Sequence, residues 1–280
     1  MSIKPSNPPT DNLALRETLF AGGLHLAKAN TASTLVVEEV RQAIVDQFGI
    51  TDIRTAHLQI SDEDFFAHMG ELRRLFYLDP HYLNRLREIL TSYGFDPERC
   101  AFDPFRIRVI LPGGHRNPKA APVYYSHRDT WYSHPQSLIV AWLPLHDLTP
   151  EETFHFYPDY FDKEVPNDSQ IFDYSDWIKD GPALKIGWQK SDSGVTGGYP
   201  RGLEKETPAK KIGFSCKAGE TLFFSGSQFH QTREQDLGTI RFNLDFRIVH
   251  LDDEVAKRGA PNVDNRSQGN ILADYIHPTA

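Results

Sequence analysis

The sequence contains little cysteine and no excess of positive charge. Its only cysteines are Cys100 and Cys216, too few for a disulfide framework. Both stand among apolar or turn residues, so we expect core thiols rather than metal ligands. The net charge of −8 argues against a protein that binds nucleic acid or an anionic membrane in general.

Long apolar runs are also missing. No stretch is apolar for long enough to cross a bilayer, and the first residues show no signal-peptide pattern. We therefore expect a cytoplasmic protein with neither a membrane nor a nucleic acid as partner. Aromatic residues make up 12% of the sequence, which indicates a folded globule rather than a disordered chain.

The order of the expected elements indicates the fold class. Residues 1–100 are mainly helical, because apolar side chains recur there at helical spacing. Residues 101–252 are rich in strands, and the polar residues 253–280 are expected to wrap the surface. Helices followed by strands indicate an α+β protein of one domain. Antiparallel strands with long, uneven connections favour a double-sheet jelly roll covered by the helical layer.

The individual elements follow from local patterns. A helix interrupted near Gly22-Gly23 is expected within residues 12–30, and further helices are expected over 34–48, 61–77 and 80–93. The expected strands are 105–111, the segment around His127, 137–145, 153–157, 219–224 and 239–250.

Residues 158–217 form a long insertion rich in Asp, Gly, Ser and Pro. Loops of this length inside a compact domain are usually functional or disordered. The insertion is therefore either a lid over the mouth of the barrel or a surface excursion without a catalytic part.

A His-x-Asp motif and a distant histidine together suggest a metal site. On an extended chain, His127 and Asp129 point to the same side while Arg128 points away. His230 follows the expected aromatic strand 219–224. Two imidazoles and one carboxylate are the ligands of the facial triad that binds non-haem Fe(II). His134, His146 and His155 lie nearby in sequence, but none has a carboxylate two residues on.

These residues resemble the Fe(II)/2-oxoglutarate-dependent oxygenases, most closely the phytanoyl-CoA dioxygenase-like branch. The resemblance covers about residues 105–250 and includes 143–150, 154–158 and an arginine eleven residues after His230. It implies a double-stranded β-helix of the cupin type, with Fe(II), 2-oxoglutarate and O2 at its site. It assigns the metal to His127, Asp129 and His230, and the co-substrate carboxylate to Arg241 with Thr232. No catalytic residue beyond the metal ligands is expected.

The strand that begins at Arg241 alternates strictly. Phe242, Leu244, Phe246 and Ile248 form one face, and Arg241, Asn243, Asp245 and Arg247 form the other. The polar row is either exposed to water, as on many sheets, or turned inward around a bound dianion. Arginine offers such a carboxylate two parallel donors. The spacing from His230 favours Arg241 over Arg247 for this role.

Four further residues are candidates for contact with the substrate. Arg106 and Arg108 lie on the strand 105–111, where either a ligand or a surface salt bridge explains them equally well. Trp131 and Tyr132 follow the motif and are either core residues or part of an apolar wall around the metal.

The resemblance implies hydroxylation of an unactivated C–H bond in a small molecule, for instance one from specialised metabolism, with release of succinate and CO2. Two other classes fit the same fold. A cupin-type metal enzyme that does not use 2-oxoglutarate would have no need of a buried Arg241. A jelly-roll binding protein without catalysis would hold metal but not turn over 2-oxoglutarate.

Overall fold

The computed structural model describes residues 3–7, 12–179, 199–203 and 210–278. Its α-helices are α1 (Asn12–Phe20), α2 (Thr31–Phe48), α3 (Asp62–Leu78), α4 (Pro80–Ser92), α5 (Tyr174–Lys179) and α7 (Leu251–Val255). Its strands are β1 (His25–Ala27), β2 (Cys100–Phe102), β3 (Arg106–Ile110), β4 (Ile139–Pro144), β5 (Phe154–Phe156), β6 (Thr221–Ser225), β7 (His230–Thr232) and β8 (Arg241–His250). No helix among these residues is long and apolar enough to span a membrane.

The helices begin where side chains cap them. Asn30 and Ser33 form a reciprocal capping box at the start of α2, and Gly49 ends that helix in the left-handed conformation. The Ser61 hydroxyl accepts from the Asp64 amide at the start of α3. Asp79 caps α4 directly before a proline in its first turn. These local signals explain why the expected helices lie close to the observed ones.

The strands form two antiparallel sheets. The larger sheet has the order β1-β6-β4-β8-β2, and β3 pairs with the other half of β8 on the same side as β2. The smaller sheet contains β5 and β7. The predicted order of helices first and antiparallel strands after is confirmed.

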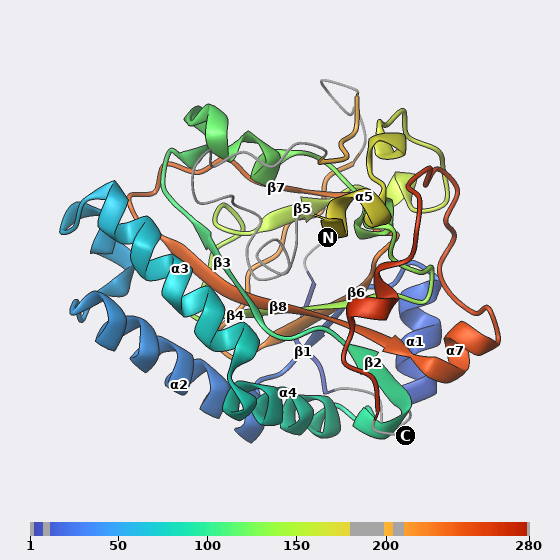
Figure 1. The fold of residues 1–280 in the computed structure, drawn as a ribbon, viewed down its shortest axis with the longest axis horizontal. Helices are drawn as coiled ribbons and strands as arrows, with labels where there is room; N and C mark the ends of the chain where they lie inside the picture. Colours follow the sequence, from blue (N-terminus) through green and yellow to red (C-terminus); the bar gives the residue numbers. More distant parts are fainter. Residues whose placement is uncertain (1–2, 8–11, 180–198, 204–209, 279–280) are drawn as a thin grey trace.

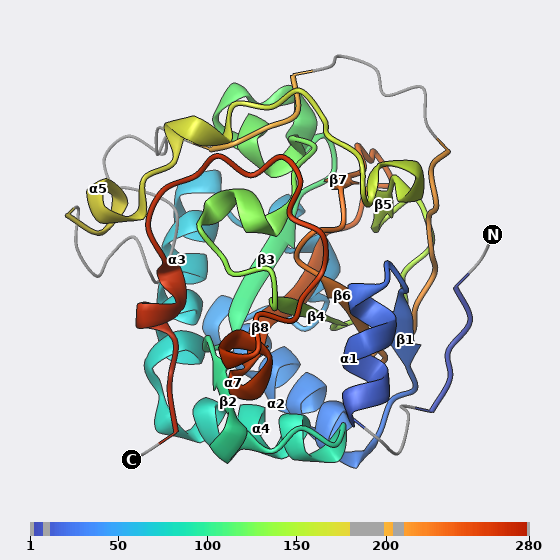
Figure 2. The same ribbon diagram turned by 90° about the vertical axis from the view of Figure 1, so that its right-hand side faces the viewer.

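The larger sheet lies between helices α2, α3 and α4 on one side and the smaller sheet on the other (Figures 1 and 2). Helices α2, α3 and α4 pack on one face, where they share an apolar core with Phe242, Leu244, Phe246 and Ile248 of β8. The opposite face carries a second apolar cluster together with the polar residues of β8, all of which are buried. The predicted alternation of β8 is therefore confirmed, and its polar row faces inward.

Three sequence-based expectations differ from the structure. Residues 25–27 form β1, which pairs with β6, and do not continue a helix. The expected strand around His127 is only a single bridge to His230, followed by a short 3-10 helix, Asp129–Tyr132. The C-terminal tail does more than wrap the surface, because Asp264 and Tyr275 are buried in it. The cysteines, as expected, are free and buried.

Candidate metal centre

The two histidines of the candidate triad are held together by their backbones. The His127 amide donates to the His230 carbonyl at 2.9 Å, and the His230 amide donates to the His127 carbonyl at 3.0 Å. His230 opens β7 and lies opposite Phe156 of β5. This pairing fixes two residues that are far apart in sequence, and it brings their ring centroids to 4.4 Å.

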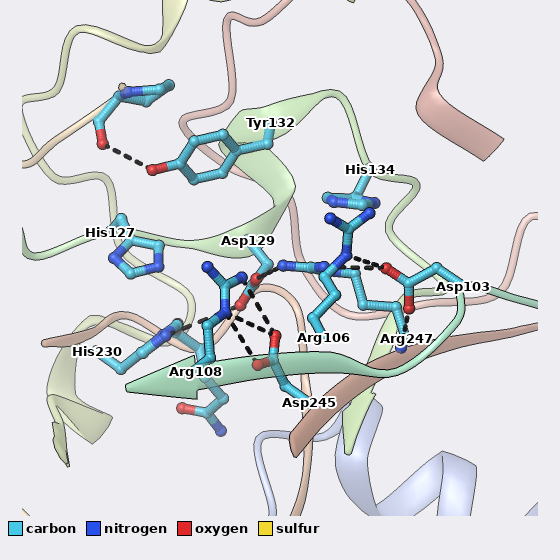
Figure 3. A network of polar contacts seen from close by, with 12 residues as sticks. Asp103, Arg106, Arg108, His127, Asp129, Tyr132, His134, His230, Asp245 and Arg247 are labelled. Atoms are coloured by element: carbon cyan, nitrogen blue, oxygen red, sulfur yellow. Dashed lines mark hydrogen bonds and ion pairs between the residues drawn. The ribbon is translucent and has the colours of Figure 1, made fainter. Parts of the chain in front are cut away.

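The expected carboxylate lies beside these rings (Figure 3). Arg128 is extended, so Asp129 points to the same side as His127, and one Asp129 oxygen is 3.9 Å from His230 Nε2. One ligand atom from each of the three residues lies within 4.8 Å of the other two. Among the described residues, this is the group of histidine, cysteine, aspartate and glutamate side chains arranged to hold a metal ion.

Hydrogen bonds orient both imidazoles. His127 Nδ1 lies 2.9 Å from the Tyr125 carbonyl, and His230 Nδ1 lies 2.9 Å from the Gln228 carbonyl. A carbonyl can only accept, so each Nδ1 carries the proton and each Nε2 keeps a lone pair. Both rings are therefore set to ligate through Nε2, which is the arrangement usual for metal-binding histidines.

The local electrostatics keep His127 and Asp129 in the forms that bind a cation. Burial lowers the pKa of His127 to about 4, with a smaller contribution from His230, so this imidazole is neutral near pH 7. Burial alone would raise the pKa of Asp129, but Arg247 and the imidazoles outweigh it and lower that pKa to about 2. Two histidine nitrogens and one carboxylate are a donor set that suits a divalent transition metal.

Arg247 of β8 connects the carboxylate to the sheet. Its guanidinium lies 3.3 Å from an Asp129 oxygen and 3.1 Å from an Asp103 oxygen, and its amide donates to the other Asp103 oxygen. Although burial opposes the charge, Asp103 and Asp129 together raise the pKa of Arg247. The resulting Asp103–Arg247–Asp129 chain fixes the orientation of the candidate ligand (Figure 3).

Arg128 anchors the His-x-Asp motif through contacts on the side away from the two candidate ligands. Its side chain is 1% exposed and ion-paired with Asp264 of the C-terminal tail. It also donates to the carbonyls of Ser227, Tyr160, Phe161 and Lys163. The residue between His127 and Asp129 therefore ties three segments of the chain to the site, which explains why it points away from the two candidate ligands.

Arg241 differs from Arg247 in its charge balance. It is 4% exposed, and its hydrogen bonds are to the backbone carbonyls of Glu152 and Thr153, both at 3.3 Å. Its Nε is buried with no partner among the described residues. Burial lowers the pKa of Arg241 to about 10. A buried guanidinium bound only by carbonyls fits a site for an anion.

Arg106 and Arg108 both form ion pairs. Arg106 lies 2.9 Å from Asp103 and stacks over Tyr77, with 5.3 Å to the ring centroid. Arg108 forms a two-pronged contact with Asp245 at 3.0 to 3.3 Å. Both arginines therefore form salt bridges, which is one of the two alternatives that the sequence left open. Since the Arg108 side chain is 37% exposed beside the candidate triad, contact with a ligand stays a prediction.

Two aromatic candidates occupy different places. The Tyr132 ring lies edge-on to His127 with centroids 5.8 Å apart, so it flanks the candidate centre. Trp131 is fully buried, and its indole N–H donates to Asp264 at 2.8 Å. It packs with Tyr157 and Phe229 in a separate apolar cluster, so Trp131 is a core residue here.

The remaining candidates are placed as follows. Thr232 lies two residues beyond His230 on β7, pairs with Phe154 and is half-buried. His134 accepts from or donates to the Tyr275 hydroxyl at 2.9 Å, and His155 interacts with the Tyr157 hydroxyl at 2.8 Å. His146 is buried beside Phe242. None of these three histidines belongs to the candidate metal group.

The sequence did not predict the part played by Asp103 and Arg247. The alternation of β8 did indicate that Arg247, Asn243 and Asp245 share a face with Arg241. No sequence signal connects Asp103 with that face, because its contact with Arg247 spans 144 positions. The predicted lid, 158–217, includes 180–198 and 204–209, which lie outside the described residues, so it stays a prediction.

Comparisons with known proteins give structural likenesses only. No family model and no curated protein matches the chain. EvdO2 from Micromonospora carbonacea var. aurantiaca shares 14% identity over 89% of this chain and 94% of its own, with a TM-score of 0.47. The non-heme alpha ketoglutarate dependent carbocyclase SnoK from nogalamycin biosynthesis shares 11% identity over 92% and 95%, with a TM-score of 0.42.

The epimerase SnoN, solved with Fe3+, alpha ketoglutarate and nogalamycin RO, shares 15% identity over 91% of this chain and 98% of its own, with a TM-score of 0.42. Likenesses at this level establish neither a family nor an activity for this chain.

Proposed function

We propose that this protein is an Fe(II)- and 2-oxoglutarate-dependent oxygenase that hydroxylates a small molecule. Two features on the side of the larger sheet that faces the smaller sheet together support the proposal. One is the convergence of His127, Asp129 and His230, with ligand atoms within 4.8 Å. The other is the buried Arg241, whose charge has no carboxylate partner among the described residues.

The donor set fits Fe(II). His127 and His230 would hold the ion through Nε2 and Asp129 through an oxygen, and this set leaves coordination positions open. When bound, iron with 2-oxoglutarate and O2 supplies the oxidation that converts a substrate C–H to C–OH, with release of succinate and CO2. Arg247 keeps the Asp129 carboxylate ionised and oriented, and the carbonyls of Tyr125 and Gln228 keep both imidazoles in the binding tautomer.

Arg241 is the proposed partner of the distal carboxylate of 2-oxoglutarate. Its guanidinium lies near the Trp142 ring, with 5.9 Å to the centroid, and is shielded from water. A charge-assisted pair in such a place is stronger than one at the surface. Arg247 is a poorer candidate because Asp103 and Asp129 already balance its charge. Thr232, on the same strand as His230, is proposed as a second donor to this carboxylate.

The proposal extends to the architecture and the family. We infer a single domain built on a double-stranded β-helix, in which β5 and β7 contribute to the second sheet. The motif spacing favours the phytanoyl-CoA dioxygenase-like branch. Tyr132 beside His127 and the partly exposed Arg108 are the proposed substrate contacts.

Binding measurements test the proposal without knowledge of the substrate. Anaerobic calorimetry would titrate Fe(II) into the metal-free protein, and then 2-oxoglutarate into the iron-loaded protein. We expect saturable 1:1 binding in both steps, and loss of the first step in His230→Ala. A protein that binds iron but not 2-oxoglutarate would instead be the cupin-type enzyme or the binding protein.

A further inference from the structure

Helix α3 brings a basic side chain to the edge of the larger sheet. Among the described strands β3 pairs with β8 alone, so its other side is an open edge, and α3 runs along that edge (Figure 1). The Arg106 guanidinium of β3 stacks on the Tyr77 ring of α3, at 5.3 Å from the ring centroid. This contact aligns the helix with the strand.

The alignment brings Arg73 close to Arg108. Arg73 precedes Tyr77 by four residues, so the two side chains lie on one face of α3, about 6 Å apart. Arg108 follows Arg106 by two residues, so both point to the same side of β3, about 7 Å apart. The two steps are therefore of similar length. The two guanidiniums do interact, because burial and then the Arg108 charge lower the pKa of Arg73 to about 10.

This arginine pair borders the candidate metal centre. Figure 3 shows the Arg108 guanidinium beside His127, and its charge interacts with that imidazole. Tyr199 interacts electrostatically with both Arg73 and Tyr132, and the Tyr132 ring flanks His127. One guanidinium from β3 and one from α3 therefore lie next to the metal site.

Part of the arginine pair is open to a ligand. Asp245 accepts from Nε and Nη2 of Arg108 at 3.0 to 3.3 Å, whereas Arg108 Nη1 has no hydrogen-bond partner among the described residues. The Arg108 side chain is 37% exposed, and Arg73 is half-buried. A guanidinium donates readily to carboxylate and phosphate oxygens, and a second positive charge close by adds to the attraction of an anion.

We propose that Arg73 and Arg108 bind a negatively charged group of the substrate, a carboxylate or a phosphate, beside the metal. The inference rests on the proposed function, because it takes the metal site as the place of reaction. The anion is distinct from the co-substrate, whose distal carboxylate is assigned to the buried Arg241. The substrate class is therefore a small organic acid or phosphate ester, and a neutral analogue binds less tightly because it offers the two arginines no counter-charge.

Inorganic sulfate probes this site without knowledge of the substrate. Wild-type protein loaded with Fe(II) and 2-oxoglutarate, under anaerobic conditions, would be titrated with sulfate at constant ionic strength while its melting temperature is followed. Arg73→Gln and Arg108→Gln each remove one positive charge of the pair. Arg74→Gln is the matched control, because Arg74 is the next residue of α3 and is exposed.

We expect a saturable rise in melting temperature in the wild type and in Arg74→Gln. Arg73→Gln and Arg108→Gln should need roughly tenfold more sulfate for the same rise, because each loses a hydrogen bond to a charged group. A response of Arg73→Gln equal to that of the wild type, or no saturable response in the wild type, would overturn the inference.

Matched pairs of compounds test the same site during turnover. The panel would contain carboxylic acids with their amides and phosphate esters with their dephosphorylated alcohols, and succinate release would be measured. The charged member of a pair should be the better substrate, and Arg73→Gln should raise its KM roughly tenfold while the Kd for 2-oxoglutarate is unchanged. A neutral compound that the wild type and Arg73→Gln oxidise equally well would contradict the inference while the proposed function stands. If sulfate binding depends on Arg73 but 2-oxoglutarate does not bind to the iron-loaded protein, the anion site stands and the proposed function fails.

Discussion

The same substitution at two arginines of β8 should change the free energy of unfolding in opposite directions. Arg241 and Arg247 are both buried on the inward face of β8. Among the residues that the structure describes, Arg241 donates only to backbone carbonyls, whereas Arg247 lies between Asp103 and Asp129. Replacement of each by methionine, which has a similar length, removes the charge and keeps most of the packing.

The magnitudes follow from the charge environment. Burial lowers the pKa of Arg241 to about 10 from an ordinary 12.5, which corresponds to about 3 kcal/mol against the charged form. Arg241→Met should therefore raise the free energy of unfolding of the metal-free protein, by roughly 1–3 kcal/mol after lost hydrogen bonds are counted. Arg247→Met leaves two buried carboxylates without their partner and should lower it by about 3–5 kcal/mol.

Arg241→Met should weaken the binding of 2-oxoglutarate even though it stabilises the metal-free protein. Arg241→Met removes the charged partner of a desolvated carboxylate, which costs about 2–5 kcal/mol, or roughly thirtyfold or more in the Kd for 2-oxoglutarate. Urea unfolding of the metal-free proteins and calorimetry of the iron-loaded proteins measure the two effects. A clear loss of stability in Arg241→Met, combined with unchanged 2-oxoglutarate binding, would refute the assignment of Arg241 to an anion site.

Three further outcomes are expected. His127→Ala and His230→Ala should each abolish turnover while circular dichroism is unchanged, and wild-type activity in either would exclude the triad. Burial lowers the pKa of His127 and His146 to about 4 from 6.5, so the unfolded chain binds more protons below pH 6.5. The neutral imidazoles therefore contribute fully to the free energy of unfolding of the metal-free protein above pH 6.5, and this contribution is lost as the pH falls toward 4. A denaturation midpoint that does not change over this range would contradict the burial of neutral imidazoles. Asp264→Leu should destabilise the protein by about 3–5 kcal/mol, because Arg128 loses its buried counter-charge, and a double variant with Arg128→Met should recover part of this loss.

The parts of the fold that depend on local chemistry could be predicted from the sequence. The capped helices α2, α3 and α4 start within a few residues of the expected positions, because Asn, Ser and Asp side chains meet free amides at their N-termini. The alternation of β8 separated its polar row from its apolar row, since side chains of a strand point alternately to its two faces, but it left open which row faced inward. These signals are contained within short segments.

The parts that depend on distant contacts could not be predicted. The three-residue strand β1 exists because β6 supplies its hydrogen-bond partners, and a segment that short has no periodicity of its own. Asp103 acquires its role only when β8 places Arg247 beside it. The motif indicated which residues to examine at the candidate site, but the charge balance that separates Arg241 from Arg247 is visible only in three dimensions.

We propose that the triad and Arg241 together support oxidation coupled to 2-oxoglutarate. The most direct test is the release of succinate from 2-oxoglutarate by the aerobic protein with Fe(II), across a panel of candidate small molecules. We expect iron-dependent succinate release that a substrate stimulates, with one succinate for each substrate molecule oxidised, and none in His230→Ala. Succinate release that does not depend on iron, or that persists in His230→Ala, would contradict it.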